Sequence, residues 1–214
     1  MDDETIAARI REIFDHPTGE SPWYTVADSV PEDLPPIESV HVLTAFFEDP
    51  TRYLSSYSDT QIADGSTYLL ETALSSYALA LLDPSVDLAL RLRAVAAIPI
   101  VFDEVFAVRC LPDLSHAKTT EISPLNMTCY MWWDFFPTWG APRRDVDTAL
   151  LNVMTTILAT PSSACREAAL HGLGHWRHAY PDHVHAIIGR FLQLTPPDDP
   201  LRKYAQDAHF GCVQ

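Results

Sequence analysis

The chain has 214 residues, of which 47% are hydrophobic and 20% charged, and its formal net charge is −15. This length and composition predict one folded domain with a substantial core and exclude a disordered chain. No apolar segment approaches the ~20 residues that a membrane-spanning helix needs, and the acidic N-terminus has no signal-peptide pattern. We therefore expect a cytoplasmic protein that does not interact with membranes.

The negative charge is concentrated in the first part of the chain. Residues 1–90 contain 17 of the 29 acidic side chains and only three arginines, whereas residues 91–214 are nearly neutral. Such a field repels nucleic acids and attracts basic proteins, so we expect a basic protein partner and no nucleic acid. The alternative is that the acidic side chains only keep the protein in solution.

The N-terminal part of the chain divides into two predicted segments. Residues 1–16 form a predicted helix, because isoleucines recur on one side at helical spacing. Residues 17–36 are rich in proline and acidic side chains, which indicates an extended segment. Since Trp23 and Tyr24 need a groove in which to bury their rings, we expect this segment to be docked on the rest of the domain.

Residues 37–194 contain apolar side chains at three- and four-residue spacing and no alternating β pattern, which predicts an all-α domain. Prolines and polar loops divide this region into helices, with one break expected at Pro99. Residues 195–214 would form a C-terminal cap containing a short helix. The predicted hairpins pair 37–49 with 59–82, 86–98 with 99–109, 124–136 with 143–160, and 162–178 with 181–194.

Residues 161–194 carry the clearest repeat signal, a helix, a Pro-Asp turn and a second helix. The first helix matches an Arg-x-x-Ala…Leu-Gly pattern through Arg166, Ala169, Leu173 and Gly174. On this match the segment resembles one HEAT-type helical repeat, and residues 86–109 echo the pattern weakly. The resemblance implies an α-α superhelix of about four stacked antiparallel hairpins, an architecture that mostly provides protein-binding surfaces.

Five histidines surround the turn of this segment: His171, His175, His178, His183 and His185. The spacing of His171, His175 and His178 allows neighbouring pairs to share a divalent metal such as zinc. Because His171 and His178 lie ~10.5 Å apart along a straight helix, a complete site needs Asp182, His183 or a residue of another hairpin. The alternatives are a pH-sensitive protein-binding surface and a solvated helix face.

Residues 127–139 are rich in aromatic side chains and predict a helix buried between layers. Asp134 is unusual there, because a buried carboxylate needs backbone donors or an arginine, for which Arg143 and Arg144 are candidates. In the alternative, these side chains line a groove that grips a basic side chain of a partner. The residues predicted to bind in this way are Asp134, Trp132 and Trp139.

The residues thus favour a non-catalytic protein-binding module, an acidic HEAT-like scaffold for a basic partner of the immunity or inhibitor type. The alternative is a metal-binding protein or metal-dependent enzyme that uses the cluster from His171 to His185; a third possibility is an adaptor docked near Trp139. No catalytic triad, phosphate loop or nucleotide fingerprint is present, so we predict no catalytic residue and no cofactor other than a divalent metal. Cys129 and Cys165 lie on apolar helical stripes and are expected in the core, and the four widely spaced cysteines do not indicate a disulfide framework.

Overall fold

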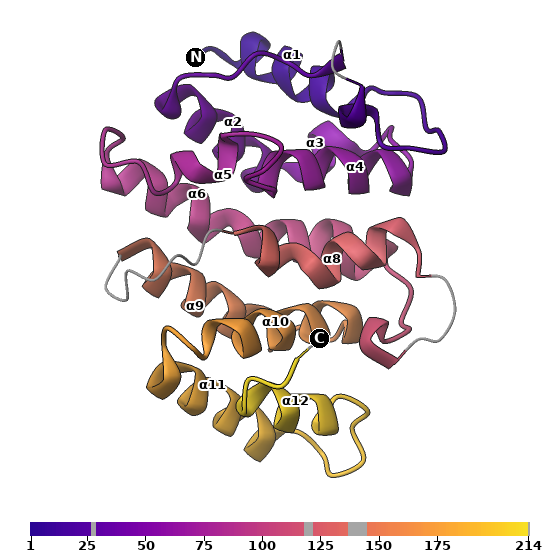
Figure 1. Ribbon diagram of the computed structural model, residues 1–214, viewed down its shortest axis with the longest axis vertical. Helices are drawn as coiled ribbons and strands as arrows, with labels where there is room; N and C mark the ends of the chain where they lie inside the picture. Colours follow the sequence, from indigo (N-terminus) through magenta and orange to yellow (C-terminus); the bar gives the residue numbers. More distant parts are fainter. Residues whose placement is uncertain (27–28, 118–121, 137–144, 214) are drawn as a thin grey trace.

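The computed structural model describes residues 1–26, 29–117, 122–136 and 145–213, and within these ranges it contains helices and no β-strand, which confirms the all-α prediction. Figure 1 shows the helices stacked from α1 at one end to α11 and α12 at the other. The main helices are α1 (Asp3–Phe14), α2 (Pro36–Glu48), α3 (Pro50–Leu54), α4 (Asp59–Leu70), α5 (Tyr77–Ala80), α6 (Leu88–Val101), α7 (Ala107–Arg109), α8 (Pro124–Phe135), α9 (Asp145–Ile157), α10 (Ser163–Trp176), α11 (Pro181–Leu194) and α12 (Arg202–His209).

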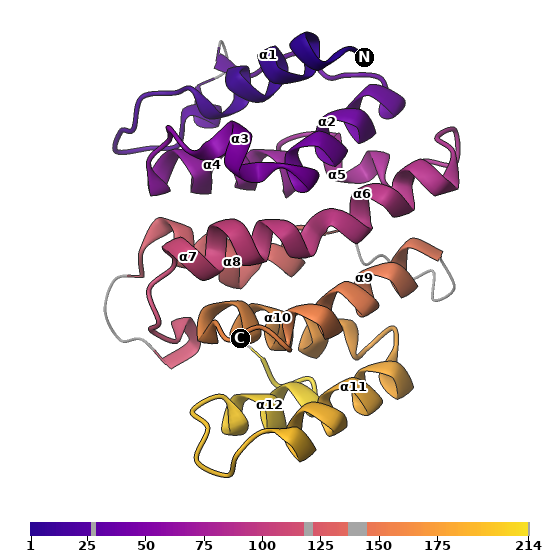
Figure 2. The same ribbon diagram turned by 180° about the vertical axis from the view of Figure 1, so that it is seen from behind.

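The longer helices alternate between two rows as the chain proceeds. One row contains α2, α6, α9 and α11, the other contains α4, α8, α10 and α12, and neighbours within each row pack against each other. The two rows can be followed from opposite sides in Figures 1 and 2. Helix α1 packs across α2 and α4 and covers one end of the stack. This arrangement of helical pairs is consistent with the predicted superhelix.

The predicted break at Pro99 is wrong. Helix α6 continues through Pro99, and a π-helical turn (Phe102–Phe106) and α7 extend it to Arg109. Proline removes one backbone donor and crowds the preceding turn, but burial of Val95, Ile98 and other apolar side chains keeps the chain helical. Residues 86–98 and 99–109 therefore form no hairpin. Helix α9 pairs with α10 and α11 with α12, although α10 also contacts α11, its predicted partner.

Helix α10 lies at the centre of the C-terminal half and contacts α8, α9, α11 and α12. It begins after Ser162, whose side chain accepts a hydrogen bond from the backbone N–H of Cys165. A Cβ atom on Gly172 would lie only 2.4 Å from Cγ of Trp133, so the close approach of α8 and α10 requires glycine here. This contact places His171, which precedes Gly172, opposite Asp134, which follows Trp133.

Trp23 anchors the segment between α1 and α2. Its ring is 8% exposed, stacks on His16 at a centroid distance of 4.0 Å and also contacts Tyr68. Two of the four cysteines, Cys129 and Cys165, are buried in the core as predicted. Among the described residues, no helix is both long enough and apolar enough to cross a membrane.

Candidate metal centre

Three potential metal ligands converge where α8 meets α10. The Nε2 atoms of His171 and His175 are 3.2 Å apart, Oδ2 of Asp134 lies 3.2 Å from Nε2 of His171, and its Oδ1 lies 3.5 Å from Nε2 of His175. Zn–N bonds of about 2.0–2.1 Å at tetrahedral angles separate neighbouring ligand atoms by about 3.3 Å. The three side chains therefore have the spacing of ligands that share one ion.

The structure corrects the predicted ligand set. His171 and His175 come together as their four-residue spacing predicts, but His178 is exposed beyond the end of α10 and is not part of the cluster. The third position belongs to Asp134, which comes from a different helix. His183 and Asp182 are also exposed and lie outside the cluster.

The predicted aromatic groove around Asp134 is wrong for Trp132. Its other predicted aromatic residue lies outside the described part of the chain. Trp132 is fully buried in the core, where it packs against Phe102 and Phe106, so it offers no surface to a partner. Trp139 and the two arginines predicted to pair with Asp134, Arg143 and Arg144, are outside the described residues. The described partners of the Asp134 carboxylate are the two histidines.

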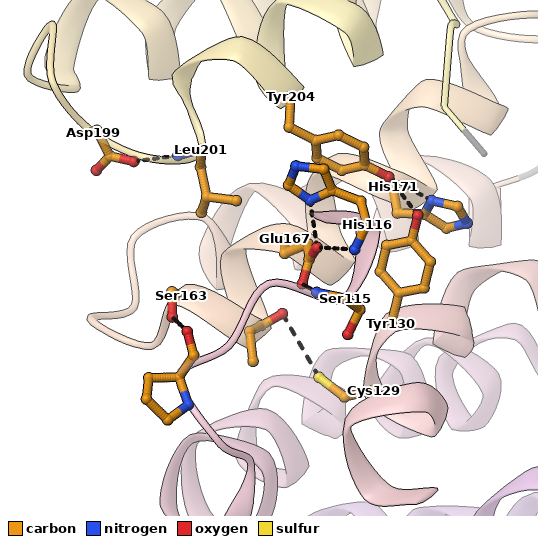
Figure 3. Close-up of polar contacts among 12 residues, drawn as sticks. Ser115, His116, Cys129, Tyr130, Ser163, Glu167, His171, Asp199, Leu201 and Tyr204 are labelled. Carbon is orange, nitrogen blue, oxygen red and sulfur yellow. Dashed lines mark hydrogen bonds and ion pairs between the residues drawn. The ribbon is translucent and has the colours of Figure 1, made fainter. Parts of the chain in front are cut away.

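A hydrogen-bond chain orients His171 from behind (Figure 3). Its Nδ1 lies 2.7 Å from Oη of Tyr204, which lies 2.8 Å from Oη of Tyr130. Burial is the main cause that raises the pKa of Tyr204, so its hydroxyl stays protonated. A metal on Nε2 would leave the proton of the neutral ring on Nδ1, and the Nδ1–H group would donate a hydrogen bond to Oη of Tyr204. This is the outer-shell contact that metal-binding histidines usually make.

A second buried network supports Tyr204, and the sequence analysis did not predict it. The Glu167 carboxylate is 0% exposed and accepts hydrogen bonds from the backbone N–H groups of Ser115 and His116, each at 2.8 Å. It also lies 2.6 Å from Nδ1 of His116, whose ring stacks on Tyr204 at 4.0 Å (Figure 3). The only sequence signal was an acidic residue at an otherwise apolar position of α10.

The cluster is buried on one side and open on the other. The His171 side chain is 2% exposed, whereas those of Asp134 and His175 are 23% and 44% exposed. An ion can therefore enter from solvent and keep a coordination position on the open side. Burial lowers the pKa of His175, nearby Asp134 acts in the opposite direction, and His171 lowers it further. His175 thus stays neutral, as a metal ligand must be, to a lower pH than a free histidine.

This lowered pKa predicts that acid destabilises the metal-free protein. The unfolded chain binds a proton at His175 near pH 6.5, at which the folded protein resists protonation, so stability falls as the pH drops below about 6.5. Urea unfolding at pH 7 and pH 5 measures the difference. We expect His175→Gln to reduce the pH dependence of stability and His178→Gln to retain it. If both variants keep the pH dependence of the unmodified protein, His175 does not contribute to it.

No protein-family model matches the chain, and no curated protein or solved structure matches it either. The fold and the cluster thus define the class directly: an all-α protein of two helical rows, with one carboxylate and two imidazoles converging between adjacent helices of one row. These three groups can share either a metal ion or a proton, because the same atoms lie within both ligand and hydrogen-bond distances.

Proposed function

We propose that this protein binds a divalent transition-metal ion through Asp134, His171 and His175, with zinc as the best match. The observation that carries the proposal is the set of 3.2–3.5 Å separations among ligand atoms from two rigid helices. Imidazole and carboxylate are ligands that zinc accepts, and the hydrogen bond between Nδ1 of His171 and Tyr204 supplies an outer-shell contact.

The number of ligands favours a functional ion over a purely structural one. Structural zinc sites usually have four protein ligands, whereas catalytic sites have three and leave one position for water or substrate. Within the described part of the chain the cluster offers three ligands, Asp134, His171 and His175, and two of them face solvent. A zinc ion held in this way would polarise a bound water or carbonyl group on the open side, so the proposal includes a metal-dependent enzyme.

Zinc titration of the purified, metal-stripped chain, followed by calorimetry and native mass spectrometry, tests the proposal. We expect one zinc ion per chain, and at least roughly a hundredfold weaker binding in Asp134→Asn and His175→Gln, because even outer-shell losses cost ~10–100-fold. His178→Gln is the matched control and keeps full affinity. If neither ligand variant changes zinc affinity, the three groups form a hydrogen-bonded network without a metal.

We also propose, as a second function, that the acidic end of the stack binds a basic protein. Residues 1–90, with 17 acidic side chains and three arginines, form α1 to α5 at that end, and most of these acidic residues are exposed. The helices lie in two stacked rows, and stacks of helical pairs provide extended binding surfaces. The same charge disfavours nucleic acids and anionic membranes, and we infer a cytoplasmic location for the complex.

Charge reversal provides the test of this second function. A basic partner, captured from an extract of the source organism at low salt and identified by mass, should dissociate at high salt. We expect a triple charge-reversal variant to lower the partner's affinity about tenfold, because each exposed charge contributes roughly 0.5 kcal/mol. That variant reverses Glu4, Asp15 and Glu20 to lysine, and the control reverses Asp103, Asp182 and Asp198. Equal weakening by both variants would exclude a specific role for the acidic end.

A further inference from the structure

A groove lies between α9 and α11, in the row of helices that does not contribute the metal ligands. Its volume is about 730 Å³, which is within the ~300–1,000 Å³ typical of small-molecule sites. Leu151 and Leu158 line it from α9 and the turn that follows, and Ile187 and Phe191 line it from α11. Any ligand in this groove therefore has a substantial apolar part.

The charge along the groove is opposite to that of the whole protein. Arg166 and Arg190 line it, and no carboxylate from the described part of the chain does, although the protein has 29 acidic side chains and 14 basic ones. Nη1 of Arg166 pairs with Asp199 at 3.1 Å, but its Nε and the nearby Oγ1 of Thr160 are buried without a hydrogen-bond partner. Arg190 is exposed. The groove thus offers one exposed cationic side chain, Arg190, beside an apolar floor, with the paired Arg166 on the same lining.

We propose that this groove binds a small amphipathic carboxylate, with its apolar part on Ile187 and Phe191 and its anionic group beside Arg190 and Arg166. Arginine donates two parallel hydrogen bonds to a carboxylate, and the apolar floor binds the rest of the molecule. This site is independent of the metal centre.

Calorimetric titration with dodecanoate below its micelle concentration tests the proposal, with dodecyltrimethylammonium as the probe of equal chain length and opposite charge. We expect one dodecanoate per chain, bound at least tenfold more tightly than the cation. Arg190→Glu should weaken dodecanoate at least tenfold. Arg11→Glu is the matched control, because it makes the same charge change on an exposed arginine of α1, and it should leave the affinity unchanged.

A steric variant separates groove binding from adsorption elsewhere. Ala186 lines the groove and is exposed, so Ala186→Trp fills space there without disturbing the core. We expect this variant to lose dodecanoate binding while its thermal midpoint stays that of the unmodified protein. The proposal is overturned if both head groups bind equally well, if Ala186→Trp retains full affinity, or if an acidic amphipathic peptide binds and dodecanoate does not.

Discussion

Zinc at a hundredfold excess over its dissociation constant is expected to stabilise the folded chain by ~2.7 kcal/mol. For a protein of this size, 1 kcal/mol corresponds to ~2–4 °C, so the thermal midpoint should rise by roughly 5–11 °C. The reason is that the unfolded chain does not hold Asp134 next to His171 and His175, so the ion binds mainly the folded state. Circular dichroism melts with zinc, and again after addition of a chelator, measure the shift.

Two variants identify the source of this stabilisation. His175→Gln removes a ligand and should reduce the shift to about 1–2 °C or less, whereas Tyr204→Phe removes only the hydroxyl that contacts Nδ1 of His171. The loss of that outer-shell contact should weaken zinc by ~10–100-fold and reduce the shift at a fixed zinc concentration. A full shift in His175→Gln would instead assign the stabilising ion to other side chains, such as the exposed His183 and His185.

Glu167→Ala is expected to lower the free energy of unfolding by roughly 2–6 kcal/mol, because two backbone donors lose their buried acceptor. The substitution leaves the N–H groups of Ser115 and His116 without their acceptor in a region where Ser115 is 6% exposed. Unsatisfied buried donors each cost ~1–3 kcal/mol. Urea denaturation at neutral pH measures the loss.

Glu167→Gln provides a graded control, because the amide keeps the volume and one acceptor oxygen but loses the negative charge. It should be destabilised less than Glu167→Ala. Asp198→Ala removes an exposed carboxylate between the last two helices and should change stability by no more than about 0.5 kcal/mol. A loss below 1 kcal/mol in Glu167→Ala would mean that Ser115 and His116 find other acceptors, and that Glu167 does not hold this loop.

Sequence periodicity was sufficient for the parts of the site that lie within one helix. The four-residue spacing of His171 and His175 predicts neighbouring imidazoles, and their Nε2 atoms are 3.2 Å apart. The third ligand could not be assigned, because Asp134 is 37 residues away from His171 and meets it through the tertiary packing of α8 on α10, which includes the Gly172–Trp133 contact. Its aromatic neighbours marked Asp134 as unusual, but they did not identify its partners.

The wrong prediction of a helix break at Pro99 and the unpredicted role of Glu167 have a comparable origin. Pro99 is a strong local break signal, but the proline lies inside a helix whose burial stabilises it more than one lost hydrogen bond costs. Glu167 is inconspicuous in sequence because the groups that donate hydrogen bonds to it are backbone N–H groups of a loop about 50 residues earlier. Long-range contacts of this kind leave no periodic pattern in the chain.

If Asp134, His171 and His175 hold a metal ion as proposed, the hydrogen bond between Tyr204 and His171 couples the affinity for that ion to the docking of α12. In a linear stack of helical pairs, a terminal pair can open by itself, because it contacts only one neighbour. Here Asp134, His171 and Tyr204 belong to α8, α10 and α12, three successive helices of one row. Detachment of α12 therefore removes the group that orients a metal ligand. By thermodynamic reciprocity, a partner that held α12 in place would then raise the affinity for the proposed ion, and the ion would raise the affinity for that partner by the same factor.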